Sequence, residues 1–241
     1  KFVNAKRTLG TQMKATGEIM SIANTFEASL MKAIRSLELN IYGLIVPVIR
    51  DLSDEALSER LKTVDDMRMF VLAEALRRGY TIEQLYDITL VDKFFLTKLL
   101  NIVKMEDNLL AVAKGETLSD DLFTAAVKMA FTDSYIAKLT GLNEDDICAK
   151  RKAMGLLHTF KMVDTCAGEY QAVTPYYYST FDRFNEAERT PRKKVLVLGS
   201  GPIRIGQGIE FDYCSVHSVW ALRKMGYEAI IANNNPETVS T

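Results

Sequence analysis

Cysteine and histidine are scarce in this chain of 241 residues. It contains three cysteines, Cys148, Cys166 and Cys214, and two histidines, His158 and His217. The sequence has no CxxC pair and no HExxH motif, so it lacks the usual spacing of zinc ligands. An odd number of widely spaced cysteines fits a reducing compartment better than a disulfide framework. We therefore expect no metal ligands in this chain and a cytoplasmic location.

A strong charge imbalance and a long apolar run are also missing. Thirty Lys and Arg residues balance 31 Asp and Glu residues, which leaves a net charge of -1. No overall field favours nucleic acid or an anionic membrane, so we expect neither as a partner. The uncharged stretch Leu39–Ile49 contains Pro47, and a bilayer-spanning helix needs about 20 apolar residues. The chain begins at Lys1 without a signal-peptide pattern, a start that suggests a piece of a longer protein.

The middle of the chain reads as helical. Hydrophobic residues make up 48% of the sequence and charged residues 25%, as in globular proteins with a core. From Leu52 to about Leu157, apolar residues recur at helical spacing, and helix-capping residues punctuate them. We expect helices to start at Ser53, at Thr81 with Gln84, at Ser119 and at Asn143. The short connections and the lack of a 30–45-residue period predict an irregular helical bundle.

An earlier helix is predicted near the start of the chain. Asn24 is the expected N-cap, with Glu27 at the third helical position. Apolar residues then form one stripe, which must pack on something, although little apolar sequence precedes it. The stripe consists of Phe26, Leu30, Ala33, Ile34 and Leu37.

The end of the chain changes character. Residues 158–180 lose the helical period and are rich in tyrosine, as in extended chain and turns, and residues 182–194 form a charged connection with Pro191. Val195–Leu198 is an apolar run typical of a buried parallel strand, and Glu228–Ala232 is a second such run. With the helix between them they predict a βαβ unit. Its strands need further strands and helices as cover, so we expect the native protein to continue.

Glycines follow the first strand of this unit. A turn of this kind brings backbone N–H groups close to an anion, as in dinucleotide-binding folds. The position of the third fingerprint glycine is Arg204, however, and Gly206 and Gly208 come too late. No Gly-Lys-Ser/Thr follows, and Asn233–Asn235 occupy the place of the ribose-binding acid. NAD binding is disfavoured, although a nucleotide-binding oxidoreductase remains an alternative.

Several motifs resemble a known family. GSGPIRIGQGIEFDYC at 199–214 and NPETVST at 235–241 are similar to the opening of the second half of carbamoyl phosphate synthetase large subunits. Thr11–Lys14, Gly17-Glu18 and Ala33–Glu38 resemble the end of the first ATP-grasp module, and Val163–Ala167 also matches.

The resemblance implies a mainly α chain. Its irregular helical bundle, the oligomerisation domain, is flanked by the tail of an ATP-grasp module and by the start of an α/β pre-ATP-grasp domain. The implied boundaries are an ATP-grasp tail at 1–40, the oligomerisation domain with an extended tail at 41–181, a linker at 182–194, and the first βαβ unit of an α/β pre-ATP-grasp domain at 195–241.

The resemblance also implies an activity for the whole subunit. Such enzymes make carbamoyl phosphate from bicarbonate, ammonia and two ATP, with ammonia supplied from glutamine by a small amidotransferase subunit. Their ligands for ATP, magnesium or manganese, and potassium lie in regions absent here. We therefore expect no catalytic, cofactor-binding or metal-binding residue in this stretch, no activity from it alone, and self-association through its helices. The alternative is a non-enzymatic helical assembly module.

One role implied by the resemblance does touch this chain. Carbamate decomposes in water, so the two active sites must be joined by a passage that excludes solvent. By resemblance, the residues along this carbamate tunnel are Met13, Glu18, Arg204, Gly208 and Glu210.

Four of these residues also have an ordinary structural explanation. Glu210 is expected near a helix start, where it complements the helix dipole, and Arg204 can pair with a nearby acid. Glu18 suits a solvated turn, and Met13 suits a core gap. The sequence leaves both explanations open.

Overall fold

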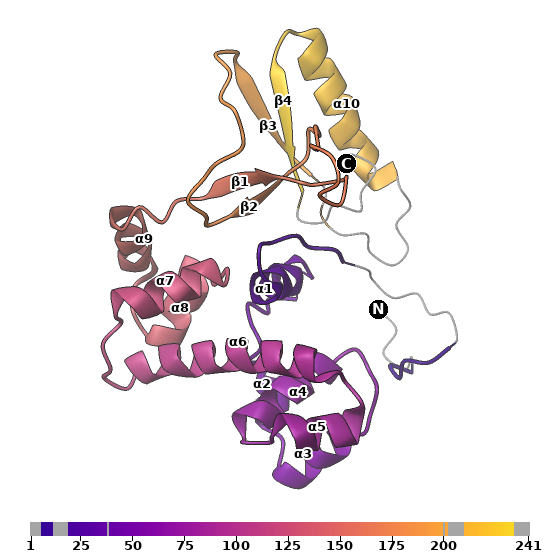
Figure 1. Cartoon of the computed structure of the whole chain (residues 1–241), viewed down its shortest axis with the longest axis vertical. Coiled ribbons are helices and arrows are strands. Elements are labelled where there is room, and N and C mark those ends of the chain that lie inside the picture. The colour runs from indigo at the N-terminus through magenta and orange to yellow at the C-terminus, as the bar shows by residue number, and fades with distance from the viewer. Residues whose placement is uncertain (1–5, 12–18, 38, 200, 202–209, 234–241) are drawn as a thin grey trace. The chain divides into compact units, whose positions relative to one another are not determined.

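The computed structural model describes residues 6–11, 19–37, 39–199, 201 and 210–233. The chain divides into two compact units (Figure 1). The first unit comprises Lys1–Lys14 and Asn40–Ala153, and the second comprises Ala15–Leu39 and Met154–Thr241. Along the sequence, the chain therefore passes from the first unit to the second, back to the first, and then to the second again. We describe each unit by itself.

The first unit is the predicted irregular helical bundle. Its longest described helix, α6, packs against α4, α5 and α8, while α9 packs on α8. Leu96, Ile102 and Leu109 on α6 are fully buried, which places this helix in the core. The helices of the unit are α2 (Pro47–Arg50), α3 (Asp54–Leu61), α4 (Arg68–Arg77), α5 (Ile82–Thr89), α6 (Lys93–Val112), α7 (Asp120–Lys128), α8 (Asp133–Thr140) and α9 (Glu144–Ala153).

Local capping residues start the helices where the sequence predicts. The Ser53 hydroxyl accepts from the Ala56 N–H, and the Ser119 hydroxyl accepts from the Leu122 N–H, both at 3.2 Å. Thr81 and Gln84 form a reciprocal capping box at the start of α5. These bonds satisfy backbone N–H groups that have no partner within the helix. The predicted starts of these three helices are confirmed.

Helix α1 (Phe26–Ser36) belongs to the second unit and begins one residue later than predicted. The N-cap is Thr25, whose hydroxyl accepts from the Ala28 N–H at 3.2 Å. The prediction of Asn24 is wrong because the Asn24 side chain has tertiary partners instead. Its carbonyl oxygen accepts from the Tyr178 hydroxyl at 2.7 Å, and its amide donates to Asp182 at 3.2 Å.

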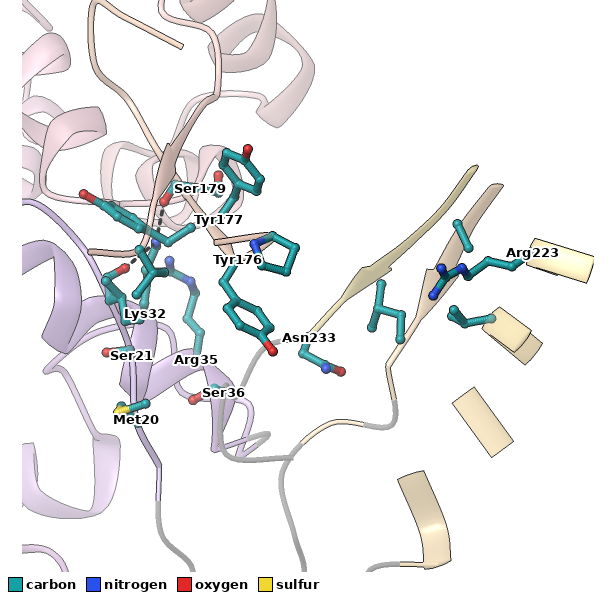
Figure 2. Close-up of a pocket in the computed structure, with 17 residues that line it drawn as sticks. Met20, Ser21, Lys32, Arg35, Ser36, Tyr176, Tyr177, Ser179, Arg223 and Asn233 are labelled. Carbon is teal, nitrogen blue, oxygen red and sulfur yellow. Dashed lines mark hydrogen bonds between the residues drawn. The ribbon is translucent and has the colours of Figure 1, made fainter. Parts of the chain in front are cut away.

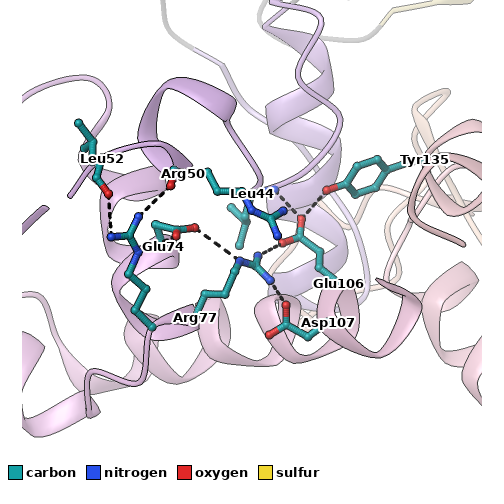
Figure 3. A network of polar contacts seen from close by, with 9 residues as sticks. Leu44, Arg50, Leu52, Glu74, Arg77, Glu106, Asp107 and Tyr135 are labelled. Carbon is teal, nitrogen blue, oxygen red and sulfur yellow. Dashed lines mark hydrogen bonds and ion pairs between the residues drawn. The ribbon is translucent and has the colours of Figure 1, made fainter. Parts of the chain in front are cut away.

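A buried polar network crosses the core of the first unit (Figure 3). The Glu106 side chain, on α6, is fully buried and accepts from the Leu44 N–H and the Tyr135 hydroxyl, each at 2.7 Å. It also pairs with Arg77 of α4, which in turn pairs with Asp107. Burial raises the pKa of Glu106, because desolvation opposes its charged form. The network fastens the segment that contains Leu44 to helices α4, α6 and α8.

The second unit carries two small sheets. Strand β1 (Thr159–Met162) pairs antiparallel with β2 (Tyr177–Thr180), so that Thr159 faces Thr180. Strand β3 (Lys194–Leu198) pairs parallel with β4 (Glu228–Ala232), so that Lys194 faces Glu228. Helix α10 (Glu210–Lys224) connects β3 to β4 and packs on both. The predicted βαβ unit is confirmed.

Within the described part of the chain, one face of the β3–β4 sheet is left exposed. Leu196 is 58% exposed and Leu198 is 76% exposed, whereas Val195 and Val197 between them are partly buried. The apolar run Val195–Leu198, of a kind normally buried on both faces of a sheet, is thus buried on one face only among the described residues. This agrees with the expectation that the strands need further cover. Among the described helices, none is both long and apolar enough to cross a bilayer.

Candidate functional site

The glycines after β3 allow a close approach of two chain segments. The Gly199 N–H donates to the Ala232 carbonyl at 2.8 Å. A Cβ at Gly199 would overlap the side-chain oxygen of Asn233, so a larger residue does not fit there. Gly201 has φ +83°, a conformation that side-chain-bearing residues rarely adopt. The carboxyl ends of the two parallel strands therefore meet at this turn.

Helix α10 begins shortly after the turn with acidic residues. Glu210 is its first residue, and Asp212 is fully buried in its first turn. A carboxylate in this position interacts favourably with the positive end of the helix dipole. At the carboxyl ends of β3 and β4, the described residues thus combine a tight glycine turn with the start of a helix, as predicted.

Most of the predicted tunnel residues lie outside the described part of the chain. Met13, Glu18, Arg204 and Gly208 fall in the ranges 12–18 and 202–209. The backbone of Glu210 lies at the start of α10, but the structure does not describe its side chain. Their assignment as tunnel residues stays a prediction.

The second unit also contains a cavity of about 750 Å³ (Figure 2). Its wall comes from residues 20–22, helix α1, the segment 175–179 with strand β2, helix α10 and strand β4. In this view the ends of Lys32 and Arg35 lie close together, and the ring of Tyr176 lies between Arg35 and Asn233. Asn233 joins the cavity to the edge of the β3–β4 sheet.

Two partly buried cations on α1 line this cavity. The Lys32 ammonium donates to the Ile22 carbonyl at 2.8 Å and to the Ser179 carbonyl, and lies 5.6 Å from the centre of the Tyr178 ring. Burial lowers the pKa of Lys32 to about 8, and the charge of Arg35 adds to this effect. Burial also lowers the pKa of Arg35 to about 10. Both shifts show that these charges sit in a poorly solvated place.

The sequence patterns do not single out these two cations. Arg35 lies within the family-like segment Ala33–Glu38, and Lys32 is one of several polar residues of an amphipathic helix. The available signal was their spacing, since residues three apart share a helix face. That spacing does not reveal whether the face is buried, which depends on β2 and residues 20–22.

The histidines and cysteines of the described chain have ordinary surroundings. His158 exchanges a hydrogen bond with the Ser179 hydroxyl at 3.0 Å and packs on Phe181, with ring centres 4.2 Å apart. His217 packs between Tyr213 and Trp220. The three cysteines are free thiols. Within the described residues, no three His, Cys, Asp or Glu side chains are grouped so that they could hold a metal ion.

Two family models match the chain. Residues 18–155 match the oligomerisation domain of the carbamoyl-phosphate synthetase large chain, and residues 191–241 match the carbamoyl phosphate synthase preATP-grasp domain. A carbamoyl phosphate synthase large chain of Agathobacter rectalis is 55% identical, and one of Lachnoclostridium phytofermentans is 54% identical, each over 100% of this chain. This chain spans 22% of the length of either relative. It belongs to the family of carbamoyl-phosphate synthetase large chains.

Proposed function

We propose that this chain is the part of a carbamoyl phosphate synthase large chain that links its two synthetase halves. The observation that carries the proposal is the order of the matches, in which an oligomerisation domain at 18–155 precedes a preATP-grasp domain at 191–241. The two relatives that match over the full length of this chain are both named carbamoyl phosphate synthase large chain.

We propose the following division of the chain. Residues 1–40 are the tail of the first ATP-grasp module, residues 41–181 the oligomerisation domain with its extended tail, residues 182–194 a linker, and residues 195–241 the start of the preATP-grasp domain of the second half. The exposed connection between β2 and β3, with Phe184 at 71% exposure, supports a linker there.

For the whole enzyme we propose a cytoplasmic, ATP-dependent ligase. It makes carbamoyl phosphate from bicarbonate, ammonia and two ATP, and a small amidotransferase subunit supplies the ammonia from glutamine. ATP, magnesium or manganese, and potassium serve the full subunit. The described residues do not fit a metal site, since they contain no grouping of three metal-ligating side chains. We therefore assign no step of the chemistry to the residues of this chain.

The role proposed for this chain is to line the passage for carbamate. Met13 and Glu18 belong to the first half, and Arg204, Gly208 and Glu210 follow the glycine turn of the second half. The proposal is supported by the Gly199 N–H, which donates to the Ala232 carbonyl, because the carboxyl ends of parallel strands form the edge where such sheets bind ligands. Arg204 attracts the anion, and Gly208 leaves room for it.

The test is Arg204→Ala in the full-length enzyme with its small subunit. We expect the partial ATP reactions to stay close to wild type while the overall synthesis of carbamoyl phosphate falls by at least about tenfold or carbamate escapes into solution, which is about 1.4 kcal/mol in the overall rate. Arg189→Ala, in the exposed linker, is the matched control. An unchanged overall rate in the Arg204 variant would contradict the tunnel role.

A further inference from the structure

Strand β1 has one edge paired with β2 and a second edge that faces away from it. Among the described residues, the sheet consists of these two strands alone. In an antiparallel pair, every second residue points its N–H and C=O groups away from the partner strand. On β1 these outward groups belong to Phe160 and Met162. An edge of this kind is a template for pairing with another strand, and folded proteins usually cover it.

The chain between β2 and β3 covers this edge without forming a strand of its own (Figure 1). The Phe160 N–H donates to the side-chain oxygen of Asn185, and the Met162 N–H donates to the Glu186 carboxylate, both at 2.8 Å. The Glu186 N–H in turn donates to the Phe160 carbonyl at 2.8 Å. Two consecutive residues thus satisfy three backbone groups of β1, which a further strand would otherwise need.

Charged groups hold the same stretch on β1. The Lys161 side chain is only 14% exposed and pairs with Glu186 at 3.0 Å and with Asp182 at 3.7 Å. Its ammonium also lies 5.9 Å from the centre of the Phe184 ring. The Asp182 N–H donates to the Thr159 hydroxyl at 3.1 Å. Several charges joined in a network contribute more than an isolated surface pair, so residues 182–186 are attached to β1 at several points.

The other end of the connection is attached to β4. Glu228, the first residue of β4, accepts from the Thr190 hydroxyl and pairs with Arg192 at 3.6 Å and with Lys194 at 3.5 Å. Its N–H donates to the Lys193 carbonyl at 2.9 Å. Residues 187–189 alone separate this attached stretch from the one on β1. Three residues, even fully extended, bridge at most roughly 10–14 Å.

We propose that residues 182–194 form a strap, which closes the free edge of β1 and ties that strand to β4, and do not form a flexible tether. The strap leaves β1 unavailable to a strand from elsewhere, and it transmits a displacement of β1 to the β3–β4 sheet. The proposal concerns the segment named above as the linker. It rests only on these contacts, so it can fail while the proposed function of the chain holds.

The first experiment measures amide hydrogen exchange in the full-length large chain by mass spectrometry with electron-transfer fragmentation. Exchange reports local opening of hydrogen bonds. We expect the Met162 amide to exchange slowly in the wild type and at least tenfold faster in Glu186→Ala. Glu188→Ala, which removes an exposed glutamate of the same segment, is the matched control and keeps the wild-type rate.

The charge network has its own pair of variants. Lys161→Met should speed exchange at Met162, whereas Lys104→Met, which removes an exposed lysine of α6, should not. Glu186→Gln keeps an oxygen acceptor and loses the charge, so its rate should lie between those of the wild type and Glu186→Ala. The amides of Ile102 and Leu109, both buried in α6, should exchange equally in all variants, which excludes a general failure to fold. A Met162 rate that is the same in the wild type and Glu186→Ala would overturn the proposal.

Limited digestion with trypsin tests the strap as a whole, because it contains five cleavage sites. These are Arg183, Arg189, Arg192, Lys193 and Lys194. We expect cleavage within the strap to be at least tenfold faster in Glu186→Ala and in Glu228→Ala than in Glu188→Ala. Cleavage at Lys114, in the exposed turn after α6, serves as the internal reference. If the wild-type strap is cut as fast as that of both variants, the segment is a flexible tether and the proposal is wrong.

Discussion

At the scale of single residues, burial and close approach explain why particular side chains occupy their positions. Glu106 combines three partners around one buried carboxylate, and Gly43 lies against it. A Cβ at Gly43 would overlap the Tyr135 ring and the Glu106 carboxylate. The network therefore has room only for glycine at position 43.

We predict that Gly43→Ala destabilises the first unit. The added methyl group must displace either Tyr135 or Glu106, and overpacking of this kind costs about 1–3 kcal/mol. Chemical denaturation gives the free energy of unfolding. Gly10→Ala is the matched control, because a Cβ there meets nothing within 4 Å. Equal free energies of unfolding for the two variants would show that the space at Gly43 is not needed.

A second residue-scale prediction concerns Lys32 and pH. Its pKa is about 8 in the folded chain and about 10.5 in the unfolded chain, so the unfolded state binds more protons between these values. The contribution of Lys32 to stability is therefore present above pH 10.5, and it is lost as the pH falls through 8. The facing groups are Arg35 on α1, whose pKa burial lowers to about 10 at the upper end of this range, and Tyr178 on β2, whose pKa burial raises.

The measurement compares the free energies of unfolding of the wild type and Lys32→Met from about pH 8 to about pH 10. We expect the wild type to gain stability relative to the variant as the pH rises. The same comparison with Lys104→Met should give a difference that does not change with pH. A flat difference for Lys32→Met as well would mean that Lys32 keeps an ordinary pKa.

At the scale of elements, local chemistry determines where helices begin. Ser53, Thr81 and Ser119 cap α3, α5 and α7 as the sequence predicts, because each hydroxyl accepts from the N–H group three residues ahead. Helix α1 begins one residue later than the sequence predicts. Both Asn24 and Thr25 can cap a helix, and the contacts of Asn24 with Tyr178 and Asp182 left the capping role to Thr25.

We predict that Thr81→Ala costs about 1 kcal/mol of stability. The change removes the acceptor of the Gln84 N–H and half of the capping box, and α5 has only 8 residues, so its first turn is a large part of it. Chemical denaturation measures the loss. Thr117→Ala, in the exposed loop before α7, should change the free energy of unfolding by less than about 0.5 kcal/mol. A loss at Thr81 no larger than at Thr117 would contradict a stabilising cap.

At the scale of the whole molecule, the helical unit carries several exposed apolar side chains around the junction of α5 and α6, here called the apolar cluster. Its members are Tyr86, Ile88, Leu90, Phe94 and Phe95. Phe94 is 54% exposed and Phe95 is 46% exposed, and their rings contact each other edge to face. Adjacent exposed aromatic side chains are typical of contact surfaces between proteins. Since the cluster lies within the match to an oligomerisation domain, we expect a second copy to cover it.

We predict that the chain self-associates in sedimentation equilibrium and that replacing both phenylalanines, Phe94→Ser with Phe95→Ser, weakens the association at least tenfold. Tenfold corresponds to about 1.4 kcal/mol, which is modest for two buried aromatic side chains. Phe184→Ser, in the exposed linker, is the matched control and should leave the association unchanged. A strict monomer at all concentrations would refute self-association. An unchanged association constant in the double variant would show that the interface does not include Phe94 and Phe95.

By itself, the sequence determined the family, the helical bundle and the βαβ unit. These depend on motifs, periodicity, capping residues and glycine turns, all of which act between residues close together in the chain. The tertiary structure alone decided which distant groups meet. Lys32 reaches the Ser179 carbonyl 147 positions away, and the Leu44 N–H reaches Glu106 62 positions away. Such partners are chosen by the packing of whole elements, so local patterns do not encode the cavity or the buried network.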